Sequence, residues 1–282
     1  MVMDIKMIFS EECLEYGSWH VESPERVSRA REVLKGKGYS FLESQQASEK
    51  DILRVHNADY VQNLKDGSAE DADTPAYENI YEYAKLAAGG AVLAAKIKGF
   101  SLIRPPGHHA GRNGSALGVR TRGFCYLNNI AIAVKHIGKT ALILDIDGHH
   151  GNGTQEIFLG DDNVTYVSLH RYPYYPGTGY ASEANCLNFP LMANCGDEVY
   201  LKTLDEALNM VDVDTFEVVA VSAGFDAHAG DLASLGLTGK GFRGIGKRIA
   251  SVKKPVFFVL EGGYVGENIG KDIDELIKGL ES

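Results

Sequence analysis

The sequence lacks a long apolar run. Hydrophobic residues make up 44% of its 282 positions, yet no stretch approaches the roughly 18 residues that a membrane-spanning helix needs. A secretory signal peptide is not expected, because the N-terminal segment carries early charge and no small-residue cleavage site. Internal repeats and low-complexity linkers are also missing. We therefore expect one domain over residues 1–282 and no membrane partner.

Paired cysteines are missing too. The four cysteines, Cys13, Cys125, Cys186 and Cys195, form no CxxC motif. Their spacing argues against a structural zinc knuckle and against a dithiol redox site. Unpaired cysteines fit a protein of the reducing cytoplasm, which is the location we expect.

Basic residues are in deficit. The chain has 28 Lys and Arg against 38 Asp and Glu, a net charge of −10. Such a surface repels nucleic acid, so direct nucleic-acid binding is not expected, and it attracts cations at long range. Solubility alone would explain this charge, and a preference for cationic substrates is the alternative. The sequence leaves a homo-oligomer open.

What the chain does have is an alternation of two patterns. Six short apolar runs end in polar or glycine-rich turns: residues 3–10, 100–107, 141–148, 164–170, 218–224 and 255–263. Helical patterns lie between or beside them, at residues 23–38, 79–96, 126–138, 197–211 and 240–252. Apolar runs without alternation are typical of strands buried on both faces of a parallel sheet. The pattern predicts an α/β fold with a central, mainly parallel sheet.

Reactive side chains gather where these runs end. Five segments follow or close a run: residues 104–109, 145–150, 168–170, 222–228 and 261–264. Ligands of parallel sheets bind outside the carboxyl ends of the strands. We therefore expect the five segments to converge on one rim of the sheet.

Three of these residues suit a metal ion. Asp147 and His149 are two positions apart in an extended segment, so their side chains point to the same side. Asp226, after another run, is the candidate third ligand. Two Asp and one His with an open position suit catalytic Zn²⁺, and Fe²⁺ or Co²⁺ would also be accepted. Asp145 needs a partner if buried, so we expect it to orient a histidine or help hold a second, monovalent cation.

Two further segments offer acid–base and donor groups. The adjacent His108 and His109 follow a rigid Pro-Pro-Gly turn, and one imidazole facing a water on the metal would take its proton and pass it to a leaving amine. Tyr264 follows two glycines that let the backbone approach a ligand, so its phenol is a candidate oxyanion donor or else a packed aromatic. Phe124 and Tyr175 are candidate channel walls, or ordinary core residues.

These motifs together resemble a known family, the zinc-dependent histone deacetylases and their prokaryotic relatives, which include the acetylpolyamine amidohydrolases. The matching segments run in the family's order over most of the chain: HVESPERV, VHNADYV, RPPGHHA, GFCYLNNIAIA, DIDGHHGNGTQ, YVSLHRY, PGTG, SAGFDAHAGD, LTGKGF and LEGGY. The resemblance implies an arginase-like three-layer α/β sandwich with a mainly parallel sheet of eight strands.

The resemblance also implies a role for each site residue. It implies zinc at Asp147, His149 and Asp226, the tandem pair His108 and His109, and Tyr264 as oxyanion donor. His109 would be the general base and acid, while His108 would pair with Asp145. Potassium would touch a set made of Asp145, Asp147, His149, Ser168 and Leu169. The expected substrate channel is lined by Phe124, Tyr175, Asp73, Gly123 and Gly263, with Asp73 on its rim.

The chain departs from the family's pattern in a few places. His20-Val21-Glu22 stands where the family often has His-Pro-Glu, and Asn152 stands where some members have an aspartate beside the second histidine. The segment 179–190 is short, which predicts an open channel mouth, and the loop that closes polyamine-specific members is not evident.

Three functions remain to be weighed. The first is an amide hydrolase that removes acetyl groups from amines, either acetyl-lysine in proteins or acetylpolyamines. The second is a protein that binds acylated ligands without turnover, against which the presence of Tyr264 argues. The third is a binuclear ureohydrolase on the same fold, which would need a second carboxylate-rich metal set. Asp226 does not begin a DxD motif, because His228 stands two positions after it.

Overall fold

A single sheet forms the centre of the molecule. The computed structural model describes residues 5–282, and the strands in this range form one sheet in the order β2-β1-β3-β8-β7-β4-β5-β6. Every neighbouring pair is parallel. The strands are β1 (Met7–Phe9), β2 (Phe41–Glu43), β3 (Phe100–Ser101), β4 (Ala141–Asp145), β5 (Val164–Arg171), β6 (Cys186–Leu191), β7 (Val218–Ala223) and β8 (Val256–Leu260).

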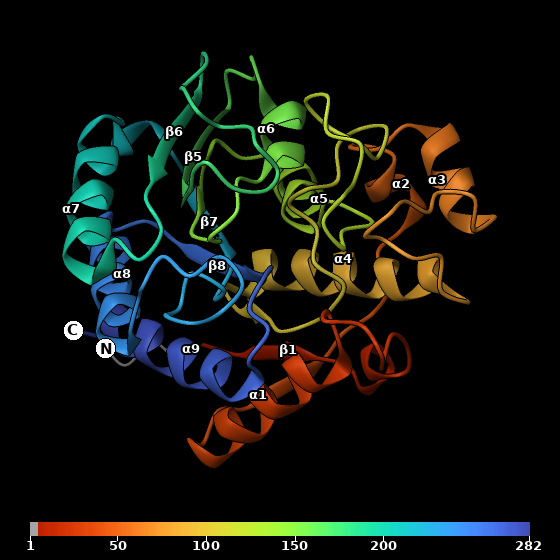
Figure 1. Ribbon diagram of the computed structural model, residues 1–282, viewed down its shortest axis with the longest axis horizontal. Coiled ribbons are helices and arrows are strands. Elements are labelled where there is room, and N and C mark those ends of the chain that lie inside the picture. The colour runs from red at the N-terminus through yellow and green to blue at the C-terminus, as the bar shows by residue number, and fades with distance from the viewer. Residues whose placement is uncertain (1–4) are drawn as a thin grey trace.

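Helices cover both faces of this sheet. They are α1 (Pro24–Gly36), α2 (Glu49–Ile52), α3 (Ala58–Lys65), α4 (Ile80–Ile97), α5 (Asn129–Ile137), α6 (Asn152–Phe158), α7 (Gly196–Asn209), α8 (Gly239–Ser251) and α9 (Gly266–Leu280), with short 3₁₀ turns η1 (Glu11–Leu14) and η2 (Val213–Thr215). Figure 1 shows α7, α8, α9 and α1 in an arc along one side, with α4, α5 and α6 on the other. The predicted three-layer α/β sandwich is confirmed.

Each apolar run contains a strand, as predicted, but the strands of three runs differ in extent from the expected runs. In the second run only β3 is a strand. The first run is a strand only over β1, and its residues 3 and 4 lie outside the described residues. The fourth run extends beyond its expected end to Arg171, because β6 pairs with it up to Arg171↔Leu191. The reactive segment 168–170 therefore lies within a strand rather than after one.

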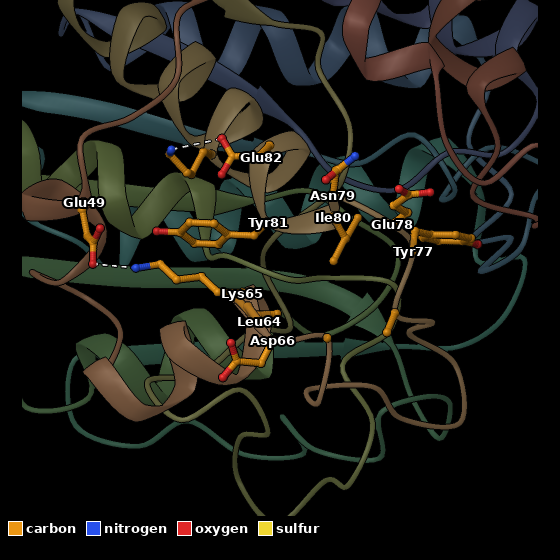
Figure 2. Close-up of a pocket in the computed structure, with 13 residues that line it drawn as sticks. Glu49, Leu64, Lys65, Asp66, Tyr77, Glu78, Asn79, Ile80, Tyr81 and Glu82 are labelled. Atoms are coloured by element: carbon orange, nitrogen blue, oxygen red, sulfur yellow. Dashed lines mark hydrogen bonds and ion pairs between the residues drawn. The ribbon is translucent and has the colours of Figure 1, made fainter.

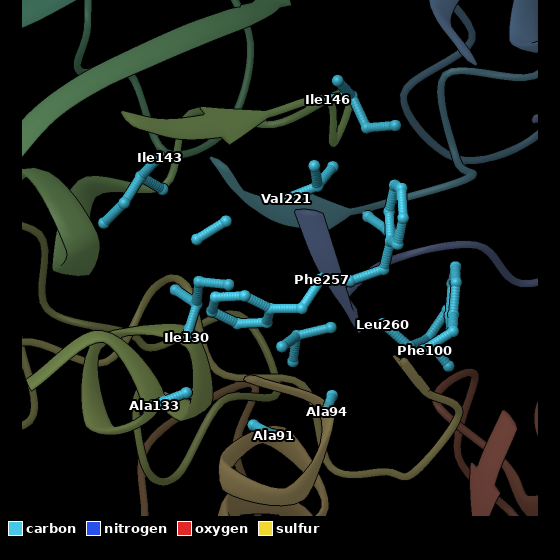
Figure 3. Close-up of a cluster of buried hydrophobic side chains, with 14 of the residues drawn as sticks. Ala91, Ala94, Phe100, Ile130, Ala133, Ile143, Ile146, Val221, Phe257 and Leu260 are labelled. Carbon is cyan, nitrogen blue, oxygen red and sulfur yellow. The ribbon is translucent and has the colours of Figure 1, made fainter. Parts of the chain in front are cut away.

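The core explains why the strands are apolar on both faces. Figure 3 shows Phe257 of β8 pointing toward Ile130 of α5, with Ile143 of β4 nearby. Small side chains of α4 and α5, such as Ala91 and Ala133, let these helices lie close to the sheet. Parallel sheets are covered on both sides by their crossover helices, so both faces of each central strand must be apolar.

Strand register sets the position of the reactive rim. Asp145 at the end of β4 lies opposite Ser168 of β5 and Ser222 of β7. The loops that follow β4 and β7 therefore leave the sheet at the same level, and those after β3 and β8 leave beside them. Within the described range, no helix is long and apolar enough to cross a membrane.

Candidate metal centre and active site

Three buried side chains from two loops meet at the rim. One ligand atom from each of Asp147, His149 and Asp226 lies within 4.8 Å of the other two. His149 Nδ1 is 3.2 Å from Asp147 Oδ1 and 2.7 Å from Asp226 Oδ2. The Gly148 N–H donates to Asp226 Oδ1 at 2.8 Å, which ties the β4 loop to the β7 loop. The structure thus brings together the three predicted metal ligands.

The surroundings of these ligands fit a cation. Asp226 Oδ2 is buried and accepts no hydrogen bond, so the short distance to His149 is a contact between two candidate ligand atoms. Burial, and next the charge of Asp147, raise the pKa of Asp226 to about 6. A Cβ on Gly262 would lie 2.5 Å from Asp147 Oδ2 and 2.6 Å from Asp226 Oδ2, so only glycine fits there. Two carboxylates and one imidazole, all three buried, are a donor set that suits Zn²⁺.

Asp145 lies directly behind this cluster. Its Oδ2 accepts from the Tyr166 hydroxyl at 2.9 Å and pairs with His108 Nδ1 at 3.0 Å, and its Oδ1 accepts from the Asp147 N–H at 3.2 Å. Ser168, predicted to touch a monovalent cation, is the register partner of Asp145. Its hydroxyl lies 2.9 Å from His170 Nδ1, and Leu169 beside it is buried in β5.

The two tandem histidines have different partners. The Asn152 amide donates to the Ala116 carbonyl at 3.1 Å, so its oxygen faces His109 and accepts from Nδ1–H at 2.7 Å. This leaves a lone pair on His109 Nε2. Burial, and next the charge of His108, hold the pKa of His109 well below its usual range. A neutral imidazole with a free nitrogen is the form that a general base requires.

A narrow cavity of about 160 Å³ opens onto these groups. It is lined by Asp73, His109, Gly123, Phe124, His149, Tyr174, Tyr175, Leu232 and Tyr264. The ring of Tyr175 lies 5.1 Å from that of His109, edge to face. A Cβ on Gly123 would lie 2.4 Å from His109 Cδ2, so a larger residue would displace the imidazole.

Most of the predicted channel residues therefore line the cavity. Asp73 accepts from the Gly123 N–H at 3.0 Å and from the Thr74 hydroxyl at 2.9 Å, so its carboxylate also holds the wall in place. Gly263 is not among the lining residues. Its carbonyl accepts from Arg26 Nε.

Tyr264 lines the cavity from a firmly held loop. Its ring lies 5.9 Å from that of Phe124, and the Arg26 guanidinium lies 4.8 Å from its centroid. Arg26 also donates to the Glu261 carbonyl at 2.6 Å, and Asp231 accepts from the Tyr264 N–H at 3.0 Å. Burial, and next the charge of Asp226, raise the pKa of Tyr264 well above its usual range. The phenol stays protonated and is available as a donor.

Sequence reasoning missed several of these residues. Tyr174, whose ring stacks 5.5 Å from that of His149, is the neighbour of a residue that was predicted. Leu232 lines the cavity and is 40% exposed, and nothing in its local sequence marks it. Arg26 lies in a helical pattern where an arginine is usually a surface residue, yet it is 1% exposed.

A larger surface hollow lies elsewhere. Figure 2 shows Tyr81 beside the ion pair of Lys65 with Glu49, whose N···O distance is 2.8 Å. Lys85 pairs with Glu82 at 3.2 Å, and its ammonium lies 5.4 Å from the centroid of the Tyr81 ring. This hollow of about 700 Å³ contains none of the predicted site residues, and both lysines are neutralised by carboxylates. We assign it no role.

Comparisons with known proteins agree with the geometry. Residues 20–280 match the family model of the histone deacetylase domain. A probable deacetylase of Archaeoglobus fulgidus is 39% identical over 296 residues, which covers 92% of this chain and 80% of the relative. Acetylpolyamine amidohydrolase 1 of Pseudomonas aeruginosa is 36% identical over 199 residues, covering 64% of this chain and 55% of the relative.

Two solved structures share the architecture. The HD domain of HDA15 superposes with a TM-score of 0.88 and 30% identity, covering 98% of this chain and 87% of that one. An acetylpolyamine aminohydrolase from Burkholderia pseudomallei gives a TM-score of 0.88 at 24% identity and 99% coverage of both chains, a likeness of fold.

Proposed function

Since the chain belongs to the histone deacetylase family, we propose that it is a zinc-dependent hydrolase that removes acetyl groups from amines. One observation supports this most strongly. His109 and Tyr264 line the same narrow cavity as His149, which belongs to the buried cluster with Asp147 and Asp226. A base, a donor and a metal-binding set around one small volume are the parts that amide hydrolysis needs.

Each group has a defined task in this proposal. Asp147, His149 and Asp226 would hold Zn²⁺, which supplies a Lewis acid and a more acidic water. His109 Nε2 takes the proton of the attacking water and then gives it to the departing amine nitrogen. The Tyr264 hydroxyl donates to the acetyl oxygen as negative charge develops there. The amide C–N bond breaks, and the products are acetate and a free amine.

Supporting groups keep the histidines in their roles. Asn152 holds the Nδ1 proton of His109, so Nε2 is the nitrogen that exchanges protons. Asp145 pairs with His108 and would also share a potassium ion with Asp147, His149, Ser168 and Leu169, as part of the proposal. Fe²⁺ or Co²⁺ would satisfy the same mixed donor set as Zn²⁺.

The substrate class is an acetylated amine. Both protein acetyl-lysine and acetylpolyamines present an acetamide on a narrow alkyl stem, which suits a narrow cavity with aromatic walls. The relatives include proteins of both kinds, named histone deacetylase and acetylpolyamine amidohydrolase. The proposal includes a cytoplasmic location, in keeping with four free cysteines.

Metal dependence gives the direct test. Asp147→Ala and His149→Ala each remove one of three protein ligands, so we expect loss of bound zinc and of acetate release. The measurements are metal content by mass spectrometry and acetate released from acetylated amines. Asp205→Ala, which breaks only the exposed pair with Arg248, is the control and should keep both. Stoichiometric zinc with near-normal turnover in either ligand variant would refute the assignment.

A further inference from the structure

We propose that Glu261 is a positioning residue, which fixes the tandem-histidine loop (residues 104–109) relative to the loop that carries Tyr264. The inference rests on the proposed function, which gives the two loops their catalytic roles. That Glu261 holds the loops in place is argued from its hydrogen bonds. Glu261 does not line the cavity, so it acts through the residues that it holds.

The side chain of Glu261 crosses from β8 to the loop after β3. Glu261 is fully buried, and its Oε2 accepts from two consecutive backbone N–H groups, Gly107 at 2.7 Å and His108 at 3.0 Å. Its Oε1 is 3.4 Å from the Ser222 hydroxyl of β7. Burial raises the pKa of Glu261 to about 7, and Oε2 can accept both N–H groups whether the carboxyl is neutral or ionised.

The loop needs such an acceptor because its strand ends early. The pairing of β3 with β8 stops at Ser101↔Val259, six residues before Gly107. Carbonyls of the loop have partners of their own: Asn129 donates to Pro105 at 2.9 Å, and the Thr154 N–H donates to His108 at 3.0 Å. The N–H groups of Gly107 and His108 are satisfied by Glu261. Buried N–H groups without acceptors are costly, so this carboxylate determines where the peptide planes lie.

The backbone around Glu261 is held just as firmly. Its carbonyl accepts from Arg26 at 2.6 Å, and the next N–H, that of Gly262, donates to Asp147 Oδ2 at 2.7 Å. Tyr264 follows two residues later. Glu261 thus connects three parts of the site. Its side chain holds the histidine loop, and the backbone next to it holds a metal ligand and leads to the oxyanion donor. Reacting groups displaced by about 1 Å lose on the order of a hundredfold in rate.

Two substitutions of similar volume separate geometry from charge. Glu261→Gln keeps an oxygen that accepts both N–H groups, whereas Glu261→Met keeps the volume and removes the acceptor. Glu156→Ala is the matched control, because Glu156 also accepts from two loop N–H groups, those of Arg112 and Leu117, at 3.1 Å each. For each variant we would measure zinc content, kcat and KM, and backbone amide hydrogen exchange.

In Glu261→Met we expect exchange at Gly107 and His108 to quicken by about tenfold or more. We expect kcat to fall about a hundredfold, with KM changed little and zinc retained. Glu261→Gln should stay close to wild type in both readouts, and Glu156→Ala should exchange faster only at Arg112 and Leu117 while keeping kcat.

Four outcomes would overturn the proposal: unchanged exchange in Glu261→Met, unchanged kcat despite faster exchange, an equal loss of kcat in Glu261→Gln, or an effect confined to KM or to zinc. A wild-type enzyme that releases no acetate would instead refute the proposed function. Exchange at Gly107 and His108 would still decide whether Glu261 fixes the loop.

Discussion

Tyr264 lines the cavity from a loop that is held on two sides. Arg26 binds the carbonyls of Glu261 and Gly263, and Asp231 accepts from the Tyr264 N–H. Tyr264→Phe should therefore leave the fold and zinc content intact, because the ring and its contacts remain. We expect kcat to fall by roughly a hundredfold or more, the scale for loss of one oxyanion donor. Unchanged kcat with stoichiometric zinc would mean that Tyr264 is only a packed aromatic.

The pairing of His109 with a neutral amide gives a second prediction at the residue scale. The low pKa of His109 places the acidic limb of the rate profile at low pH, since the base must be neutral to accept a proton. Asn152→Asp would place a carboxylate 2.7 Å from Nδ1 in the same geometry. A nearby opposite charge raises the pKa of an imidazole by about one unit or more.

The expected result is an acidic limb of kcat/KM that moves to higher pH by about that amount. The measurement is kcat/KM from pH 5 to 9 for wild type and Asn152→Asp. A limb that stays in place would show that another group is the base, and His108→Ala would then be the variant to examine.

At the scale of elements, His56 joins the segment between α2 and α3 to the start of α5. Its Nε2 accepts from the Asn128 N–H at 2.9 Å, and its Nδ1 therefore donates to the Gly111 carbonyl at 2.9 Å. The ring is buried and must be neutral, because a second proton would face the Asn128 N–H. Burial lowers the pKa of His56 to about 4.

This pairing predicts loss of stability in acid. A folded-state pKa below the unfolded value near 6.5 means that the unfolded chain binds the proton more tightly. The free energy of unfolding has its full value above about pH 6.5 and falls as the pH drops toward 4. The fall due to His56 is about 2 kcal/mol at pH 5 and about 3 kcal/mol in all.

Urea unfolding at pH 7.5 and pH 5 would measure the effect. His56→Gln keeps a donor and an acceptor but does not titrate, so its free energy of unfolding should fall about 2 kcal/mol less than that of wild type between these pH values. An equal fall in both proteins would assign the acid sensitivity to other buried histidines.

The elements also show what the sequence could and could not predict. Strands that are apolar on both faces, such as β4 and β7, could be predicted from the sequence. The rule that ligands lie beyond the carboxyl ends of strands then located Asp147, Asp226 and Tyr264. The edge strands β2 and β6 were not predicted, since an edge strand need not be apolar on both faces. The residues of β2 are partly exposed, and β6 alternates between buried and less buried residues and contains Pro190. The helix α9 was likewise not among the expected elements.

The site was less predictable where it depends on distant contacts. Arg26 and Glu261 act through backbone groups of segments more than 100 residues away, and hydrogen bonds to a backbone leave no motif in the partner's sequence. Leu232 reaches the cavity only because its loop folds back over the tyrosines, where the Tyr174 hydroxyl donates to the Leu232 carbonyl at 3.1 Å. Such residues are set by tertiary structure, which periodicity does not report.

At the scale of the whole molecule, the net negative charge of the protein and a carboxylate at the cavity have the same sign. Asp73 lines the cavity, and its neighbour Asp71 pairs with Arg122 at 3.1 Å. Burial, and next the contact with Asp73, raise the pKa of the Asp71 carboxyl. One arginine beside two carboxyl groups leaves the mouth acidic, in the same sense as the net charge of −10. Charge of one sign over a surface and at a site attracts ligands of the opposite sign.

Substrates with extra positive charge should therefore be favoured over neutral ones, and salt should weaken the preference. Long-range attraction is screened beyond about 8 to 10 Å at physiological ionic strength. Added salt should therefore lower kcat/KM for the charged substrate and change kcat little. We would compare an acetyl-lysine peptide flanked by lysines with one flanked by neutral residues, at low and high salt. Asp73→Asn tests the local carboxylate and should reduce the preference while leaving its salt dependence. Equal kcat/KM for both peptides at low salt would show that the acidity serves solubility alone.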